Sequence, residues 1–479
     1  MSQLREFLSK NVWAAWGLFL FTAGVVLVFG LLASSILERR IETKAAVRQF
    51  RPIAEMETDP SVWGQQFPRQ YDRYLQTKDM DFASREGGNI EIDMLARDPR
   101  MVVLWAGYAF SRDYNQGRGH MYAIEDITKS LRTGIAQPMT CWACKSPEVL
   151  KMMKEKGTKE FYSGKWKDGL KDMVHAIGCL DCHDPQTMSL RLARPALKEA
   201  LERQGQDAAK LNHQQMRSMV CAQCHVEYYF KGEGKELTFP WDKGMSVEEI
   251  ENYYDQAQFK DWTHALSKAP MLKAQHPDYE IYKMGIHAQR GVACADCHMP
   301  YRREGGEKFT DHHIQSPLNN IANSCQVCHR ESEATLQQNV FEHQDKIREL
   351  RHKAEDILVQ AHVEAKTAWD VGATEEEMKD VLQLIRKAQW RWDFAAAGHG
   401  SSFHAPLEVL RILGHAIDLA HEARLELNGV LIKHAVTLPV SAPDISTKEL
   451  AQRYIGLDMP LLENEKREFL KTLMIEEKK

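Results

Sequence analysis

Five cysteine pairs hold the residues of this sequence that could do chemistry. All ten cysteines occur as Cys-x-x-Cys between residues 141 and 328. Four pairs are followed directly by histidine, in CLDCH (179–183), CAQCH (221–225), CADCH (294–298) and CQVCH (325–329). The first pair, CWACK (141–145), ends in Lys145 instead. An explanation of these motifs has to cover both the repeated histidine and the single lysine.

Haem attachment explains the pairs better than zinc or thiol chemistry. Zinc sites combine pairs by twos, and five is an odd number. A thioredoxin-like motif occurs once, near a βαβ pattern. In c-type haem binding, two thioethers attach the porphyrin and the next residue is an axial ligand of the iron. We therefore predict five covalent c-type haems on the pairs Cys141/Cys144, Cys179/Cys182, Cys221/Cys224, Cys294/Cys297 and Cys325/Cys328, with proximal ligands His183, His225, His298 and His329.

Lys145 has two interpretations. It could mark a degenerate motif that lost its haem, although both cysteines remain. Alternatively its amine is the axial ligand, which requires the deprotonated form that burial and a competing metal favour. Because axial-ligand identity is a main control on haem chemistry, the lysine haem is expected to be reactive, while the other four carry electrons.

Four electron-carrying haems with two imidazoles each need four further histidines. The candidates outside the cysteine motifs are His120, His287, His312 or His313, and His404. Taken singly, each could equally be a surface or core histidine.

The elements that must position these residues divide the chain unevenly. We predict a mostly α-helical multihaem cytochrome c, with a haem-packed, loop-rich core over 61–335 and long helices over 336–479. Apolar residues at helical spacing predict helices from about 333, from 375 and after His404. The net charge of −5 gives no indication of a nucleic-acid partner.

The N-terminus carries a separate signal. After ten residues expected on the cytoplasmic side, residues 11–37 contain no charge, which suits a membrane-spanning helix better than a shorter signal-peptide core. A cleaved signal remains the alternative. The charged residues 38–60 are then a linker, and either reading places the protein on the periplasmic side of the cytoplasmic membrane.

Several motifs carry a resemblance to a known family over residues 90–415. They are LRTG (131–134), CWACKSP, CAQCHVEYY (221–229), KAQHPDYE (273–280), CADCHMP (294–300), TDHHI (310–314) and FHAP (403–406). Together they resemble the pentahaem, ammonia-forming cytochrome c nitrite reductases. That family is mostly helical, forms homodimers through long C-terminal helices and reduces nitrite to ammonium.

The resemblance implies a role for individual residues. Lys145 would be the proximal ligand of the active haem, and Arg132, Tyr228 and His276 would line its open face. Glu227, Gln275 and the carbonyls of Tyr228 and Lys273 would surround one calcium ion. The implied distal ligands are His120 for the haem on Cys221/Cys224, His312 for Cys179/Cys182, His287 for Cys325/Cys328 and His404 for Cys294/Cys297. His312 is preferred to His313 because TDH aligns with the family motif.

Other functions stay open at this point. A multihaem electron carrier would have six-coordinate iron throughout, and related reductases act on hydroxylamine, sulfite or tetrathionate. A membrane cytochrome that oxidises quinol is the expected electron donor.

Overall fold

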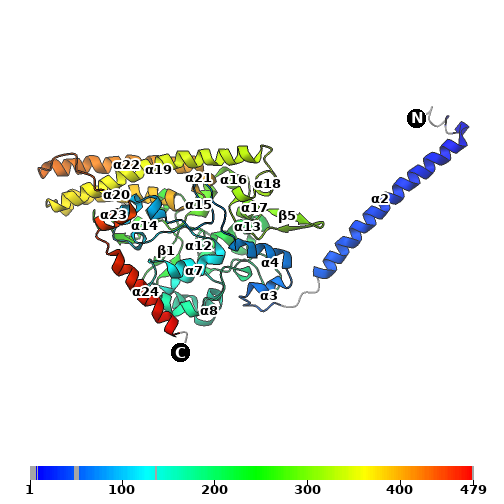
Figure 1. Ribbon diagram of the computed structural model, residues 1–479, viewed down its shortest axis with the longest axis horizontal. Coiled ribbons are helices and arrows are strands. Elements are labelled where there is room, and N and C mark those ends of the chain that lie inside the picture. The colour runs from blue at the N-terminus through cyan, green and yellow to red at the C-terminus, as the bar shows by residue number, and fades with distance from the viewer. Residues whose placement is uncertain (1–6, 8, 48–52, 135–136, 477–479) are drawn as a thin grey trace. The chain divides into compact units, whose positions relative to one another are not determined.

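The computed structural model describes residues 7, 9–47, 53–134 and 137–476 (Figure 1). By its contacts the chain separates into two units, Met1–Ile53 and Ala54–Lys479. The first unit contains helix α2, Val12–Val47. Its segment Val12–Arg40 has a mean hydropathy of 2.3 over its most apolar window, and none of that window is buried. By length and composition this segment can cross a membrane, although a signal sequence meets the same criterion.

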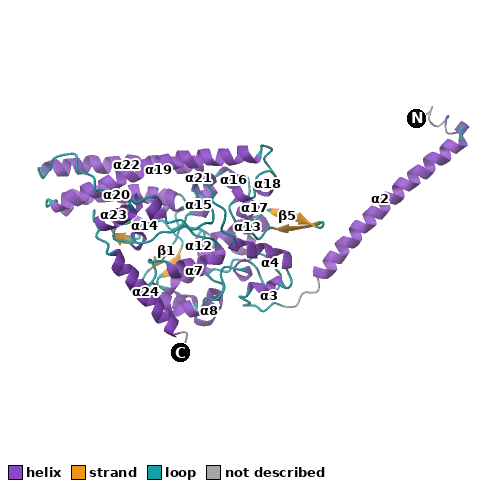
Figure 2. Cartoon of the chain, viewed as in Figure 1, coloured by secondary structure: helices purple, strands orange, loops and turns teal. Residues whose placement is uncertain are grey.

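The second unit is predominantly helical, as Figure 2 shows, and this confirms the predicted fold class. Its short helices are α3 (Pro60–Gly64), α4 (Pro68–Leu75), α5 (Met94–Arg97), α6 (Arg100–Leu104), α7 (Ala123–Lys129), α8 (Glu148–Lys156), α9 (Thr158–Ser163), α10 (Trp166–Gly169), α11 (Cys179–Cys182), α12 (Pro195–Arg203), α13 (His213–Ala222), α14 (Val247–Gln256), α15 (Asp278–Met284), α16 (Ile286–Gln289), α17 (Cys294–His298) and α18 (Ile321–Ser324). The C-terminal helices are α19 (Glu333–Asp370), α20 (Glu375–Ala397), α21 (Ser401–His404), α22 (Pro406–Lys433), α23 (Lys448–Tyr454) and α24 (Met459–Glu476).

The strands of the second unit form small antiparallel hairpins. They pair β1 (Tyr229–Lys231) with β2 (Glu236–Thr238), β3 (Trp262–Thr263) with β4 (Pro270–Met271), and β5 (Tyr301–Glu304) with β6 (Glu307–Thr310). In the third hairpin Tyr301 lies opposite Thr310, and Gly305 and Gly306 turn the chain with positive φ angles. The chain leaves β6 directly into Asp311 and His312, so this hairpin places a predicted haem ligand.

The long helices α19, α20 and α22 pack against one another and confirm the helices predicted from the apolar spacing (Figure 1). Thr374 and Glu377 form a capping box at the start of α20, which satisfies the free N–H groups of its first turn. Trp390, Trp392 and Phe394 of α20 and Leu413 of α22 are fully buried. The boundary predicted at 335/336 lies close to the start of α19, and the division into domains there stays a prediction.

Candidate functional site

One large cavity lies inside the second unit. Its volume is about 2120 Å³ and all ten cysteines line it. Pockets for single drug-sized ligands measure about 300–1,000 Å³, so this cavity has room for several large groups. None of these ten cysteines forms a disulfide bond, although they occur in close pairs.

Two of the five cysteine motifs, in α11 and α17, form single helical turns at the lining of this cavity. In α11 the carboxylate of Asp181 accepts a hydrogen bond from the Gly178 N–H at 2.8 Å, and in α17 Asp296 accepts one from Ala293 at 2.7 Å. In these two motifs the second variable residue therefore caps its own turn. Residues three apart lie on one face of a helix, so each turn presents its two sulfur atoms together.

Each histidine that follows a cysteine pair faces one of the predicted distal histidines across the cavity. The ring centroids are 6.1 Å apart for His120 and His225, 6.2 Å for His183 and His312, 6.3 Å for His287 and His329, and 6.3 Å for His298 and His404. A metal–imidazole bond is about 2 Å long, so two imidazoles bound on opposite sides of one ion have centroids roughly 6 Å apart. The spacing fits a six-coordinate iron between each pair.

Backbone carbonyls orient several of these rings. The Nδ1 atoms of His183, His298 and His312 lie 2.8, 2.9 and 2.7 Å from the carbonyl oxygens of Met188, Gln315 and Thr310. An Nδ1–H donated to a carbonyl leaves Nε2 free to bind metal. Burial lowers the pKa of His120, His312 and His404 to about 4, which keeps these imidazoles in the neutral form that ligates metals.

His404 depends on two glycines. A methyl group on Gly400 would overlap the His404 imidazole, and one on Gly285 would collide with the His404 carbonyl. Both positions therefore need glycine because the backbone approaches this histidine so closely. The sequence motif FHAP contains neither residue, so sequence reasoning missed them.

The lysine-terminated motif packs against a buried aromatic residue outside it. The Trp142 ring is fully buried and stacks on Trp166, with centroids 5.0 Å apart and planes at 13°. The Trp142 indole N–H donates to the Trp166 carbonyl at 2.9 Å. Lys145 lines the cavity together with Cys141 and Cys144.

Arg132, Tyr228 and His276 line the same cavity and lie close to this motif. The rings of Tyr228 and His276 meet edge to face, with centroids 5.4 Å apart. Burial lowers the pKa of His276 to about 3, and its buried Nδ1 has no protein partner. The Arg132 guanidinium carbon lies 4.3 Å from the Phe110 ring centroid, and Nε donates to Ser130 Oγ at 3.2 Å.

Hydrogen bonds link three of the four residues expected around calcium, and Tyr228 follows Glu227 in sequence. Glu227 is completely buried, and its carboxylate accepts the Gln275 N–H at 2.7 Å and the Tyr254 hydroxyl at 2.8 Å. The Gln275 side-chain amide lies 3.2 Å from the Lys273 carbonyl oxygen. These oxygen atoms are the donor type that calcium takes.

Further buried carboxylates surround this group. Burial raises the pKa of Glu227 well above its usual value and that of Asp261 to about 7. Asp393 is also fully buried, and its carboxylate lies 2.8 Å from Lys273 Nζ. Buried charges in proteins are paired or bind metal, so a group of acids with one lysine favours an additional cation. Sequence reasoning missed Asp261 and Asp393 because Asp393 is 120 residues from Lys273 and no local motif contains both.

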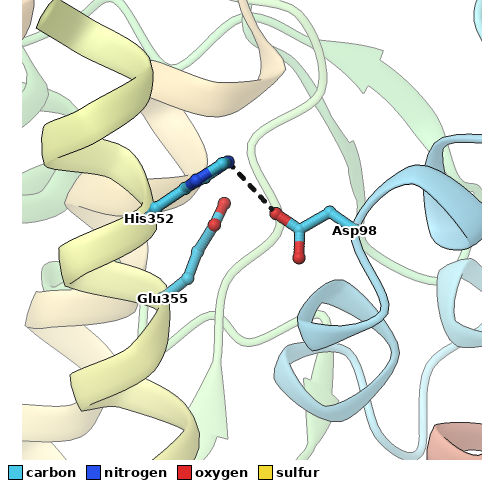
Figure 3. Close-up of side chains that lie close together, drawn as sticks. All are labelled: Asp98, His352 and Glu355. Carbon is cyan, nitrogen blue, oxygen red and sulfur yellow. Dashed lines mark ion pairs between the residues drawn. The ribbon is translucent and has the colours of Figure 1, made fainter. Parts of the chain in front are cut away.

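A second acidic group lies on α19 and before α6. Figure 3 shows Asp98, His352 and Glu355 close together, with His352 Nε2 3.8 Å from Asp98. Arg100 already lies 2.8 Å from Asp98 and 2.9 Å from Glu355. This group is an ion-pair network that joins the two helices.

Paired cysteines and facing histidines around one large cavity, in a mostly helical fold, define a multihaem c-type cytochrome. The family model for cytochrome c552 matches residues 59–479, and the chain belongs to this family. It therefore carries c-type haem, and its five cysteine pairs provide for five.

Relatives match nearly the whole chain. A cytochrome c-552 of Bacteroides fragilis is 57% identical over 472 residues, covering 97% of this chain and 96% of that protein. A cytochrome c-552 of Porphyromonas gingivalis is 53% identical over 471 residues, covering 96% of this chain and 95% of that protein. Among solved structures, the catalytic subunit of cytochrome c nitrite reductase from Desulfovibrio desulfuricans, described with two calcium sites, is similar. It superimposes with a TM-score of 0.75 at 32% identity, covering 86% of this chain and 91% of that one.

Proposed function

We propose that this protein reduces nitrite to ammonium at the haem bound by Cys141, Cys144 and Lys145, with electrons supplied through four bis-histidine haems. The observation that carries the proposal is the division of the cavity. Eight histidines pair at metal-spanning distances, while the lysine motif shares its surroundings with a guanidinium, a phenol and an unpaired imidazole. The similarity to the nitrite reductase of Desulfovibrio desulfuricans supports the same activity.

The reaction sets the requirements for the site. Nitrite, eight protons and six electrons give ammonium and two water molecules. A haem held by Cys141, Cys144 and Lys145 would supply the redox chemistry and a binding point for nitrite. The side chains around it must attract an anion, deliver protons and release a cation.

Arg132 would bind the nitrite anion. Its guanidinium is permanently charged and can donate two parallel hydrogen bonds to the nitrite oxygens. Packing over Phe110 limits where the guanidinium can point, so it is partly arranged before nitrite binds.

His276 and Tyr228 would hydrogen-bond to the substrate and deliver protons to it. Burial keeps His276 neutral, and its Nδ1 is free to take part in a hydrogen bond with a bound molecule. Burial also raises the pKa of Tyr228 well above its usual value, so its hydroxyl keeps the proton and serves as a hydrogen-bond donor.

A calcium ion held by Glu227, Gln275 and the carbonyls of Tyr228 and Lys273 would balance the buried acids beside this site. Glu227 and Tyr228 are neighbours in sequence, as are Gln275 and His276, so one ion would fix both proton-handling residues. Its double charge would add to the positive potential that retains nitrite.

The remaining partners follow from the same proposal. Helix α2 would anchor the protein on the periplasmic side of the cytoplasmic membrane, where a quinol-oxidising multihaem cytochrome or another donor supplies electrons. The long helices α19, α20 and α22 would form a homodimer interface.

The test is viologen-driven nitrite turnover by wild type, a Lys145→His variant and a control Lys151→His variant on the exposed face of α8, at equal haem content. We expect ammonium from wild type and the control, with no released nitric oxide. Turnover in Lys145→His should be lower by roughly tenfold or more, because changing a residue that merely supports a metal ligand already costs that much. Equal rates in all three would remove the special role of Lys145. Absence of ammonium from wild type would leave an electron carrier, or a reductase of hydroxylamine or sulfite, as the function.

A further inference from the structure

One lysine of the C-terminal helix α24 is buried in the interior. Only 8% of Lys466 is exposed, although its neighbours on the helix face solvent. Its Nζ donates to the Thr133 carbonyl at 2.8 Å and to Thr133 Oγ1 at 3.1 Å. Burying an ammonium group is costly unless it is well paired, so these two bonds are the reason that Lys466 is tolerated here.

Aromatic side chains complete the surroundings of this amine. Lys466 Nζ lies 5.6 Å from the Trp166 ring centroid and 5.7 Å from that of Phe469. Phe469, one helical turn further along α24, is 9% exposed and packs 6.1 Å from Trp166. Trp166 in turn stacks on Trp142 of the lysine-terminated motif. Helix α24 is therefore docked beside the proposed active haem by these two side chains.

Lys466 bonds to Thr133, and Thr133 directly follows Arg132 in sequence. The chain from 130 to 134 has no regular secondary structure. On one side of Arg132, the Leu131 N–H donates to Asp113 Oδ2 at 3.0 Å. On the other side, Thr133 Oγ1 donates to the Ile127 carbonyl at 2.6 Å while its own carbonyl accepts from Lys466. The backbone on both sides of Arg132 is thus held by hydrogen bonds, and its own N–H donates to Ser130 Oγ at 3.2 Å. Helix α24 supplies one of these contacts.

We propose that Lys466 is a positioning residue for Arg132, and that its hold on the Thr133 carbonyl sets the affinity of the active site for anionic substrate. The inference rests on the proposed function, because it takes Arg132 as the group that binds nitrite. A side chain as long as arginine places its guanidinium accurately only when its backbone is fixed. Burial lowers the pKa of Lys466 to about 8, so the amine is still protonated at pH 7 and can donate both bonds.

The test replaces Lys466 by methionine, which keeps the length and apolar stem of the side chain but donates no hydrogen bond. Lys471→Met is the matched control. Lys471 lies on the same helix, its side chain is 59% exposed, and it forms an ion pair with Glu468. For each protein, KM and kcat for nitrite are measured at pH 7. The dissociation constant of carbon monoxide on the reduced protein is measured by absorption spectroscopy.

We expect Lys466→Met to raise KM for nitrite about tenfold, equivalent to about 1.4 kcal/mol, with kcat changed less than about twofold. Carbon monoxide has no charge and cannot accept a strong bond from Arg132, so its affinity should stay at the wild-type value. Lys471→Met should match wild type in all three quantities.

Two outcomes overturn the inference. One is an unchanged KM for nitrite in Lys466→Met, and the other is a parallel loss of carbon monoxide affinity, which would mean general damage at the haem. If the methionine variant loses haem, Lys466→Gln and Lys466→Ala are compared instead by KM, kcat and carbon monoxide affinity. Glutamine retains an N–H donor and should keep KM for nitrite lower than alanine does; equal KM values in the two variants would overturn the inference. A wild-type protein that makes no ammonium refutes the proposed function itself, whereas an active wild type with an insensitive Lys466 refutes only the positioning role.

Discussion

The cavity region and the C-terminal helical region of the second unit bury histidine in opposite ways. Around the cavity, facing histidines keep their centroids 6.1 to 6.3 Å apart, with cysteines beside each pair. In contrast, His264 of the β3–β4 loop and His362 of α19 stack directly, with ring centroids 3.7 Å apart. Those two rings bond to the protein itself, His264 to the Val103 carbonyl at 2.9 Å and His362 to Gln389 at 2.7 Å. The first arrangement leaves space for a metal, and the second leaves none.

The difference extends to packing as a whole. In the helical region, large side chains of α20 and α22 such as Trp392, Phe394 and Leu413 fill the interior completely. In the cavity region, short helices and loops enclose about 2120 Å³ that side chains do not fill. Protein interiors are otherwise packed as densely as organic crystals. The haem groups therefore act as the core of one region, and amino acids act as the core of the other.

Production of the protein without haem attachment should have the largest effect on local stability. The effect should be large in the cavity region and small in the helical region. We expect backbone amides in α11, α13 and α17 to exchange with deuterium faster by roughly 100-fold or more, because local stability there depends on the missing core. Amides in α20 and α22 should change by less than about threefold. Hydrogen exchange read by mass spectrometry measures both regions in one sample. Equal protection in both regions would mean that the cavity region folds without its haems.

This contrast also explains what sequence could predict. The helices α19, α20 and α22 follow from apolar spacing because neighbouring helices alone determine which face is buried. The cysteine turns follow from their own residues, since Asp181 and Asp296 cap α11 and α17 within the motifs. The structure brings together all four predicted histidine pairs, although their role as ligands stays a prediction.

Contacts between distant segments could not be predicted in the same way. The four predicted histidine pairs are 42 to 129 residues apart in sequence, and only the family resemblance linked their members. No local pattern indicates that Asp393 reaches Lys273 or that Lys466 reaches Thr133. These contacts form where segments distant in sequence pack together, and each gives a buried polar group a hydrogen-bond partner.

A Gly400→Ala substitution should have a smaller effect, confined to one histidine pair. The added methyl group would overlap the His404 ring, and forcing extra volume into a packed site costs typically about 1–3 kcal/mol. We expect His404 to move away from His298, so that reduced protein binds carbon monoxide at a second haem. Absorption and electron paramagnetic resonance spectra would detect the loss of one bis-histidine signal.

The control for this variant is Gly414→Ala in α22. A methyl group at Gly414 meets no atom within 4 Å, and alanine in a helix interior is more favourable than glycine by roughly 0.5–1 kcal/mol. Spectra should be unchanged and the helical region slightly more stable. A wild-type spectrum for Gly400→Ala would show that the cavity wall yields more easily than its close contacts indicate.

The smallest effect is expected from an ion pair on the surface of the helical region. Arg411 of α22 donates to both carboxylate oxygens of Glu248 in α14, at 3.0 and 3.1 Å. Burial alone would raise the pKa of Glu248, but the hydrogen bonds and charge of Arg411 outweigh it and lower the pKa. The unfolded chain then binds more protons between the two pKa values, so the pair stabilises the fold above the unfolded pKa of about 4.3 and loses this effect as pH falls through the folded pKa.

A Glu248→Gln variant measures this contribution directly. At pH 7 it should lower the free energy of unfolding of the helical region by less than about 1 kcal/mol, since the pair is partly exposed. The difference from wild type should shrink as pH falls below about 4.3, where the unfolded carboxyl gains its proton. Urea denaturation followed by circular dichroism is the suitable measurement, because guanidinium chloride would screen the pair. Glu422→Gln on the exposed face of α22 removes the same charge without this partner and should show no such trend; a pH-independent deficit in Glu248→Gln would mean that Glu248 acts through packing rather than charge.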